Sequence, residues 1–170
     1  MTSIEAAREG RHILVYTDGS CHGNPGPGGY AAVMMRMDGS DVLKKRKPIL
    51  GYVAEETTNV KMEMMAVIAA LEALKPDEQE PIVVYCDNDM IPKAMNEWIQ
   101  GWIANGWRKS NKEPVKNRDL WERLVAAAEG KIVEWRWVKA HAGHPYNEEV
   151  DRLAQAQKEK ARPAYYGFAA

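Results

Sequence analysis

Hydrophobic positions along the chain follow two spacings, one typical of buried strands and one typical of helices that pack on a sheet. Short apolar runs bounded by turn residues predict five strands, at about 12–17, 30–37, 42–53, 81–87 and 131–138. Stretches in which apolar residues recur every three or four positions predict four helices, at about 58–75, 91–104, 118–129 and 146–160. The chain is therefore expected to combine one sheet with several helices.

Polar residues and prolines at the ends of these stretches support the helix boundaries. Thr57 or Thr58 is a plausible N-cap for the first helix, and Pro76 ends it. Pro92 is compatible with the first turn of the second helix, and Asn117 is expected to cap the third. The first three helices thus have start signals that agree with their apolar periodicity.

The order of these elements predicts the fold class. Three strands come first as a hairpin meander, with Asp38-Gly39-Ser40 as the turn between the second and the third. Residues 19–29 contain five glycines and two prolines, so we expect a loop between the first two strands. Helices and strands alternate afterwards. This order predicts a mixed α/β protein with a five-stranded mixed sheet flanked by helices.

The length and composition of the chain predict a single folded domain. A chain of 170 residues with 45% hydrophobic content is long enough to bury its own core. We place the domain at 11–160, between a flexible N-terminus at 1–10 and a loose C-terminal tail at 161–170. No internal repeat divides it.

Several features of the sequence indicate a soluble, cytoplasmic protein with no membrane partner. The first ten residues are polar and do not resemble a signal peptide, and no apolar stretch approaches ~18 residues. Cys21 and Cys86 follow no metal-binding spacing and are interpreted as reduced, buried thiols. The net charge of −1 provides no overall attraction for a polyanion. Any nucleic acid must therefore be held by local basic clusters.

Four carboxylates are placed where the fold could bring them together. Asp18 and Asp87 each end an apolar run, so neighbouring parallel strands would put both at one sheet edge. Glu63 lies on the apolar face of the first helix, and Asp151 borders the apolar face of the last. Singly, each could be a turn residue, a helix cap or a solvated charge. Together in a partly desolvated pocket, they would repel unless a divalent cation lay among them, and oxygen ligands favour Mg²⁺ or Mn²⁺ over zinc.

Three segments resemble the motifs of type 1 ribonuclease H in its bacterial form. The first is Tyr16-Thr-Asp-Gly-Ser-Cys-His-Gly-Asn-Pro-Gly-Pro-Gly-Gly-Tyr30, and the second is Thr57-Thr-Asn-Val-Lys-Met-Glu-Met-Met-Ala66. The third runs from Trp137-Val-Lys-Ala-His to Val-Asp-Arg-Leu-Ala154. Motif order and spacing agree from about residue 13 to residue 157, which is nearly the whole chain.

This resemblance implies the ribonuclease H fold and hydrolysis of the RNA strand of RNA–DNA hybrids with two Mg²⁺ ions, Mn²⁺ being an alternative. Cleavage would leave 5′-phosphate and 3′-hydroxyl ends. The family's metal-binding carboxylates fall on Asp18, Glu63, Asp87 and Asp151, and its mobile catalytic histidine falls on His141. His144 is interpreted as a histidine that packs in the loop. The implied partner is the hybrid duplex, and we expect a monomer.

The resemblance also assigns the residues that would hold the hybrid. Asn24 and Asn59 would lie in its minor groove, and Thr58 at a DNA phosphate. Three tryptophans at helical and near-helical spacing favour core packing as a generic pattern, whereas the resemblance favours a helix–loop protrusion that contacts the DNA backbone. The residues of this protrusion are Trp98, Trp102, Trp107, Arg108, Lys109, Lys112 and Lys116.

Some positions depart from the family pattern. Asp87 is followed by Asn88 and Asp89, where the family commonly has a serine next, and the additional charge at Asp89 is expected to weaken substrate binding. Val60 removes one expected groove contact, and Ile103-Ala-Asn105 replaces a basic cluster of the protrusion.

Two alternative functions stay open on the same fold. One is a hybrid-binding module without catalysis, and the other is a nuclease that acts on DNA junctions or duplex DNA.

Overall fold

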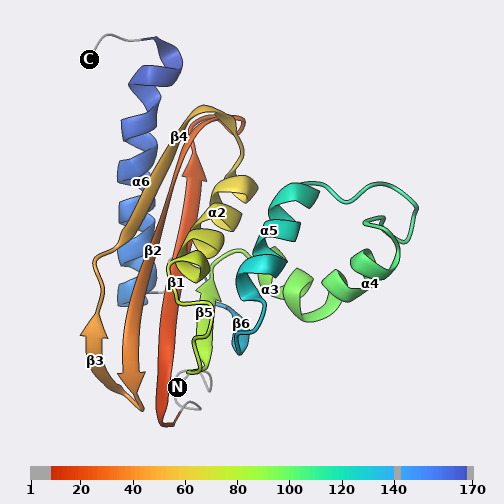
Figure 1. Ribbon diagram of the computed structural model, residues 1–170. Coiled ribbons are helices and arrows are strands. Elements are labelled where there is room, and N and C mark those ends of the chain that lie inside the picture. The colour runs from red at the N-terminus through yellow and green to blue at the C-terminus, as the bar shows by residue number, and fades with distance from the viewer. Residues whose placement is uncertain (1–8, 140–142, 168–170) are drawn as a thin grey trace.

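The computed structural model describes residues 9–139 and 143–167, and Figure 1 shows their arrangement. The strands are β1 (Arg11–Cys21), β2 (Gly26–Asp38), β3 (Asp41–Lys45), β4 (Ile49–Thr57), β5 (Ile82–Cys86) and β6 (Val133–Trp137). The helices are α2 (Asn59–Glu72), α3 (Met90–Lys93), the π-helical segment η1 (Ala94–Trp98), α4 (Ile99–Ala104), α5 (Arg118–Ala128) and α6 (Pro145–Tyr166). This order confirms the predicted mixed α/β class.

The strands form one mixed sheet in the order β3-β2-β1-β5-β6, with β4 also paired to β2. β2 is antiparallel to β1, β3 and β4, whereas β5 is parallel to both β1 and β6. The carboxyl ends of β1, β5 and β6 therefore meet at one edge of the sheet. Asp18 and Asp87 were predicted to lie at that edge.

Both faces of the central strands are buried, and alternate residues belong to two separate parts of the core. On β5, Ile82, Val84 and Cys86 pack toward α2, whereas Val83 and Tyr85 pack on the opposite face. Figure 1 shows α6 along that opposite face, while α2 covers the first face and α5 packs against α2. The helical segment from α3 to α4 extends away from the sheet as an arm, followed by the loop that leads into α5.

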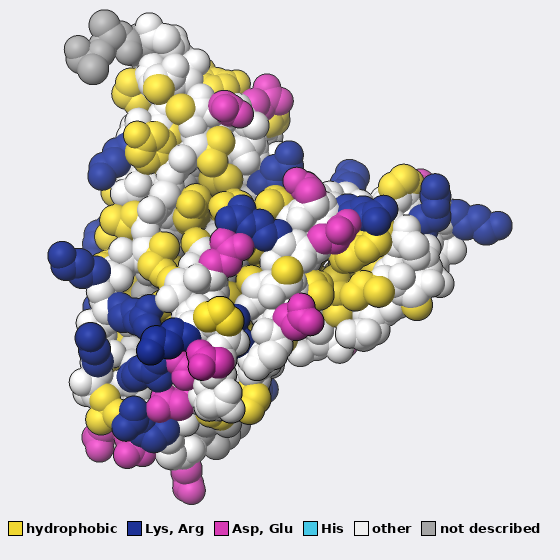
Figure 2. Space-filling model, viewed as in Figure 1, with side chains coloured by type: hydrophobic (Ala, Val, Ile, Leu, Met, Phe, Trp, Pro, Cys, Tyr) yellow, Lys and Arg dark blue, Asp and Glu magenta, His cyan; other side chains and the backbone are white. Residues whose placement is uncertain are grey.

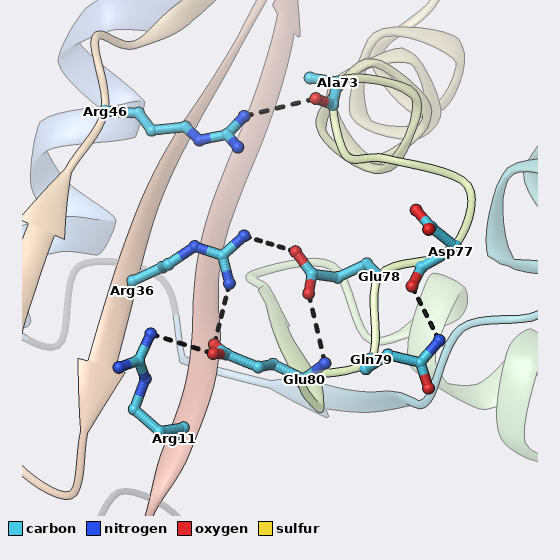
Figure 3. A network of polar contacts seen from close by, with 8 residues as sticks. All are labelled: Arg11, Arg36, Arg46, Ala73, Asp77, Glu78, Gln79 and Glu80. Atoms are coloured by element: carbon cyan, nitrogen blue, oxygen red, sulfur yellow. Dashed lines mark hydrogen bonds and ion pairs between the residues drawn. The ribbon is translucent and has the colours of Figure 1, made fainter.

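A cluster of ion pairs joins β1 and β2 to the loop that precedes β5 (Figure 3). Arg36 binds Glu78 and Glu80 at 2.5 and 2.9 Å, and Arg11 binds Glu80 at 3.1 Å. The hydrogen bond from Arg36 lowers the pKa of Glu78. Because β5 starts directly after this loop, the cluster helps to fix the strand that Asp87 follows.

The structure corrects two predictions about the strands. The strand expected at 42–53 is two strands, β3 and β4, so the sheet has six strands in the described residues instead of five. The interruption contains Pro48, which has no N–H for a continuous ladder. The loop expected at 19–29 is also wrong, because β1 continues to Cys21 and β2 begins at Gly26. A side chain at Gly29 would overlap the backbone of α6, so this glycine serves close packing.

Two helix ends and one helix cap differ from the predictions. Thr58 is the N-cap of α2 as predicted, but the helix ends at Glu72, before residue 75. Asn117 precedes α5 in a left-handed conformation and makes no capping bond through its side chain. The tail expected to be loose at 161–170 is helical through Tyr166, and Ala161 is fully buried. Residues 1–8 of the expected flexible N-terminus and residues 168–170 lie outside the described residues. Among the described helices, none is long and apolar enough to cross a membrane.

Candidate metal centre and nucleic-acid interface

Four elements bring the predicted acids to one place. Asp18 comes from the end of β1, Asp87 follows β5, Glu63 lies in the second turn of α2, and Asp151 lies in α6. One carboxylate oxygen from each of Asp18, Glu63 and Asp87 lies within 4.8 Å of the others. Asp151 joins this trio through a hydrogen bond between its carboxyl group and that of Asp18. We call these four residues the acidic cluster.

The local backbone explains why the acids converge. Thr17 and Cys86 are partners in the parallel β1–β5 register, so the acids that follow them lie side by side. Gly19 brings α2 onto β1, because a Cβ at this position would overlap the backbone of Met62 and Glu63. The absence of a side chain at Gly19 therefore allows the carboxylate of Glu63 to reach Asp18.

Burial and like charge raise the pKa values of two acids in the cluster. Asp18 is only 5% exposed, and burial, the charge of Asp87 and the hydrogen bond with Asp151 together raise its pKa to about 9. The backbone N–H of Gly19 donates to Oδ1 of Asp18 at 2.8 Å and acts in the opposite direction. Burial likewise raises the pKa of Glu63 to about 7, with a smaller contribution from Asp87. These carboxylates are therefore unfavourable as neighbouring anions in the protein alone.

The donor set of the acidic cluster fits a divalent cation. Its ligand atoms are carboxylate oxygens, and those of Asp18, Glu63 and Asp87 lie at a spacing that one ion can bridge. Such oxygens bind hard cations such as Mg²⁺ or Mn²⁺. A cation would also neutralise the charges that raise the pKa of Asp18 and Glu63. Those four acids could therefore hold a metal ion.

The pKa of Asp18 predicts how stability depends on pH without metal. Its value near 9 in the folded protein lies above the ordinary value of 3.8, so the folded state binds the proton more tightly than the unfolded state. The free energy of unfolding in EDTA should therefore fall as pH rises between about 4 and 9. We expect Asp18→Asn to gain about 1–3 kcal/mol relative to the parent between pH 5.5 and pH 8.5. Thermal unfolding at several pH values tests this, and parallel pH profiles for the two proteins would contradict it.

Two residues beside the acids were missed as site residues by sequence reasoning. The Asn88 side chain donates through Nδ2 to Oε2 of Glu63, and its Oδ1 accepts from the Met90 backbone N–H at 2.8 Å. Trp137 Nε1 donates to the backbone carbonyl oxygen of Asp87 at 3.0 Å. A polar residue directly after an acid at a strand end is a usable signal for Asn88, whereas Trp137 only begins the third motif and its contact with Asp87 has no signal in the sequence.

The structure brings together the three residues predicted for the minor groove and the DNA phosphate. Oδ1 of Asn59 accepts from the Cys21 backbone N–H at 2.8 Å, and Oδ1 of Asn24 accepts from the Asn59 backbone N–H at 3.1 Å. Thr58 directly precedes Asn59, and its hydroxyl oxygen accepts from the Lys61 N–H at 3.2 Å as the cap of α2. The two amide groups are thus fixed at the start of the helix that carries Glu63. Cys21 and Cys86 are buried and unbridged, as predicted.

The predicted tryptophans combine core packing with exposure on the arm. Trp102 and Trp107 pack against the core on the α2 side, and Trp102 meets Trp121 edge to face at 5.5 Å. Trp98 is 40% exposed and lies beside Trp102 at 5.8 Å. Figure 2 shows Lys and Arg side chains at the free end of the arm. The predicted basic residues of this segment, Arg108, Lys109, Lys112 and Lys116, are all exposed.

Two histidines and one further acid were also singled out in the sequence, and the structure describes two of these three residues. His141 lies outside the described residues, so its predicted catalytic role stays a prediction. Nε2 of His144 lies 3.1 Å from the Tyr16 hydroxyl oxygen, and its ring stacks on the Tyr16 ring, as expected for a histidine that packs in its loop. Asp89 is paired with Lys93 at 2.8 Å. The expected effect of Asp89 on substrate binding stays a prediction.

Comparison with known proteins identifies relatives of the whole domain. The RNase H family model matches residues 10–159. Ribonuclease H of Paracoccus denitrificans is 48% identical over 153 residues, which cover 89% of this chain and 96% of the relative. Ribonuclease HI of Caulobacter vibrioides is also 48% identical over 153 residues and is covered to 95%.

A solved structure agrees with these relatives in fold. It is LC9-RNase H1, described as a type 1 RNase H with the type 2 active-site motif, and it superposes with a TM-score of 0.73 at 32% identity. The match covers 88% of this chain and 75% of that protein. The family match over nearly the whole domain, on a fold that gathers the acids at one sheet edge, places this chain in the bacterial type 1 branch of the RNase H family.

Proposed function

We propose that this protein is an endoribonuclease that hydrolyses the RNA strand of RNA–DNA hybrids with divalent cations held by the acidic cluster. The observation that carries this proposal is the convergence of Asp18, Glu63 and Asp87 within 4.8 Å on an RNase H domain. Family membership supports the reaction, and the oxygen-only donor set supports Mg²⁺, with Mn²⁺ as an alternative. Two ions per site are part of the proposal.

The acids and the histidine of the site have different roles in this mechanism. Bound cations would supply Lewis-acid activation of the attacking water and charge stabilisation at the departing 3′ oxygen, leaving 5′-phosphate and 3′-hydroxyl ends. Asp18, Glu63, Asp87 and Asp151 would hold the cations and would do little proton transfer themselves. His141 is proposed to position water, to shuttle a proton or to assist product release.

Substrate recognition is proposed to combine the two asparagines with the arm. Asn24 and Asn59 are fixed through their side-chain oxygens, so their amide N–H groups are the donors that would meet the minor groove. Hybrid selectivity would come from groove width and the 2′-hydroxyl group, which distinguish RNA from DNA without reading base sequence. Thr58 and the exposed lysines of the arm would contact the DNA backbone.

We also propose that the protein acts as a monomer in the cytoplasm. The two buried, unbridged cysteines agree with a reducing compartment. Light scattering of the purified protein tests the monomer, and a stable dimer at micromolar concentration would contradict it.

A substrate panel separates this function from the two alternatives. Labelled hybrid, duplex DNA, duplex RNA and single strands are each incubated with the protein in Mg²⁺ and in EDTA. We expect cleavage of the hybrid in Mg²⁺ alone. Binding of hybrid without cleavage would favour the inactive module, and cleavage of duplex DNA would favour the DNA nuclease.

The arm predicts weak hybrid binding with a shallow salt dependence. Ala104 and Asn105 are exposed where the family commonly carries basic residues, so Ala104→Lys with Asn105→Arg should add phosphate contacts. Each contact adds about 0.7–0.9 to the slope of log affinity against log salt, so the slope should steepen by about one to two. KM should fall with little change in kcat. Hybrid binding in Ca²⁺ across a salt series measures this.

A matched control adds the same two charges elsewhere. Ser40 lies in the β2–β3 turn and Gln79 lies in the loop before β5, and both are exposed. Ser40→Lys with Gln79→Arg should leave the slope close to that of the parent. Equal slopes for the arm variant and this control would mean that residues 104 and 105 do not contact the nucleic acid.

A further inference from the structure

Asn88 occupies the short connection between Asp87 and α3. Its side chain contacts one member of the acidic cluster, Glu63, and the first residue of α3, Met90. Its Nδ2 donates to Oε2 of Glu63, and its Oδ1 accepts from the Met90 N–H at 2.8 Å. A backbone N–H can only donate, so the bond to Met90 determines which end of the amide carries the oxygen. The N–H₂ end must then face Glu63.

Two bonds also fix the backbone on either side of Asn88. The carbonyl oxygen of Asp87 accepts from Trp137 Nε1 at 3.0 Å, and the bond from Met90 closes the first turn of α3. Asp89 is the N-cap residue of this helix but makes no capping bond through its side chain, so Asn88 supplies the cap instead. Asn88 therefore cannot rotate away from Glu63 without losing its bond to Met90.

The bond to Glu63 holds the carboxylate in one orientation without placing an opposite charge beside it. Asn88 is neutral, so unlike a lysine or arginine it does not compete with a cation for the charge of Glu63. With Oε2 bonded to the amide, the plane of the Glu63 carboxylate is fixed beside Asp18 and Asp87. A partner that orients a ligand in this way commonly changes metal affinity by 10- to 100-fold when it is removed.

We propose that Asn88 is a positioning residue that orients the carboxylate of Glu63 and thereby sets the affinity of the acidic cluster for divalent cations. This inference rests on the proposed function, because it assumes that the acidic cluster binds metal. It goes beyond that function by giving a role to a residue at which this chain departs from its family.

The test uses Asn88→Ser, which retains the cap but loses the contact with Glu63. A serine hydroxyl can accept from a backbone N–H two residues ahead but is too short to replace the amide at Glu63. Mn²⁺ binding to the protein without substrate, followed by electron paramagnetic resonance, should weaken by about 10-fold. The Mg²⁺ concentration for half-maximal cleavage should rise in parallel. The midpoint temperature of unfolding in EDTA should change little for Asn88→Ser. Asn88→Ala should lower this temperature, because the cap is also lost.

Two controls separate this role from a general structural one. Asn96→Ser makes the same chemical change in η1, where Nδ2 donates to the Trp135 carbonyl oxygen at 3.2 Å, and should leave Mn²⁺ affinity unchanged. In a Glu63→Gln background, Asn88→Ser should have no further effect on Mn²⁺ affinity, because it acts through the Glu63 carboxylate.

The outcomes distinguish failure of the inference from failure of the proposed function. Equal Mn²⁺ affinity for Asn88→Ser and the parent would overturn the inference, as would an undiminished loss in the Glu63→Gln background. A parent that binds Mn²⁺ but cleaves no hybrid would overturn the function alone. A parent that binds no Mn²⁺ would overturn both.

Discussion

Asp87→Asn should reduce hybrid cleavage in Mg²⁺ by about 10³-fold or more and leave the fold intact. Asp87 is one of the three acids whose oxygens lie within 4.8 Å, so its loss removes a ligand from the centre of the acidic cluster. Metal ions contribute several kcal/mol of transition-state stabilisation, and about 4 kcal/mol corresponds to 10³ in rate. The variant should also melt at an equal or higher temperature in EDTA, since the charge of Asp87 opposes ionisation of Asp18 and Glu63.

Asp89→Asn is the matched control for this prediction. The change is the same and lies two residues away, but Asp89 is exposed and paired with Lys93 at 2.8 Å. We expect cleavage within a few-fold of the parent, with hybrid binding equal or tighter. Comparable cleavage by Asp87→Asn and the parent would exclude Asp87 from the metal site.

Gly19→Ala should lower the free energy of unfolding by about 2–4 kcal/mol, because overpacking in a close contact cannot be relieved without moving the backbone. The added methyl group would overlap the backbone of Met62 and Glu63, which belong to a helix rather than to a flexible side chain. Moving α2 away from β1 would also displace Glu63 from Asp18. Hybrid cleavage in Mg²⁺ should therefore fall even at temperatures where the variant is folded.

Gly101→Ala makes the same change with the opposite expected sign. Gly101 lies within α4 and has no atom within 4 Å of the added position. Alanine in a helix interior is favoured over glycine by about 0.5–1 kcal/mol, so this variant should be slightly more stable and equally active. Denaturant unfolding of both variants tests the pair. Equal stability of Gly19→Ala and the parent would show that β1 and α2 do not require this close approach.

The acids could be predicted because their positions follow from simple periodicities. Asp18 and Asp87 end apolar runs, and parallel pairing of the two strands, confirmed by the register of β1 with β5, brings such ends together. Glu63 follows from the apolar face of its helix. Neither step requires knowledge of side-chain conformation, so the sequence alone suffices for these three acids.

Other features depend on packing that sequence periodicity does not describe. The glycines of β2 are typical of a loop by composition, yet Gly29 is in a strand because α6 packs onto its backbone. The last helix continues past the expected end at residue 160, where Ala161 is fully buried and Tyr166 contacts the ring of His22. The bond from Asn88 to Glu63 depends on the conformations of two side chains, which no spacing rule specifies.

Cleavage of a hybrid labelled on both strands tests the central claim most directly. The RNA and DNA strands carry different labels, and the products formed in Mg²⁺ and in EDTA are separated and their new ends identified. The account predicts that only the RNA strand is shortened, only in Mg²⁺, with 5′-phosphate and 3′-hydroxyl ends. Cleavage of the DNA strand, or shortening of the RNA strand in EDTA, would contradict it.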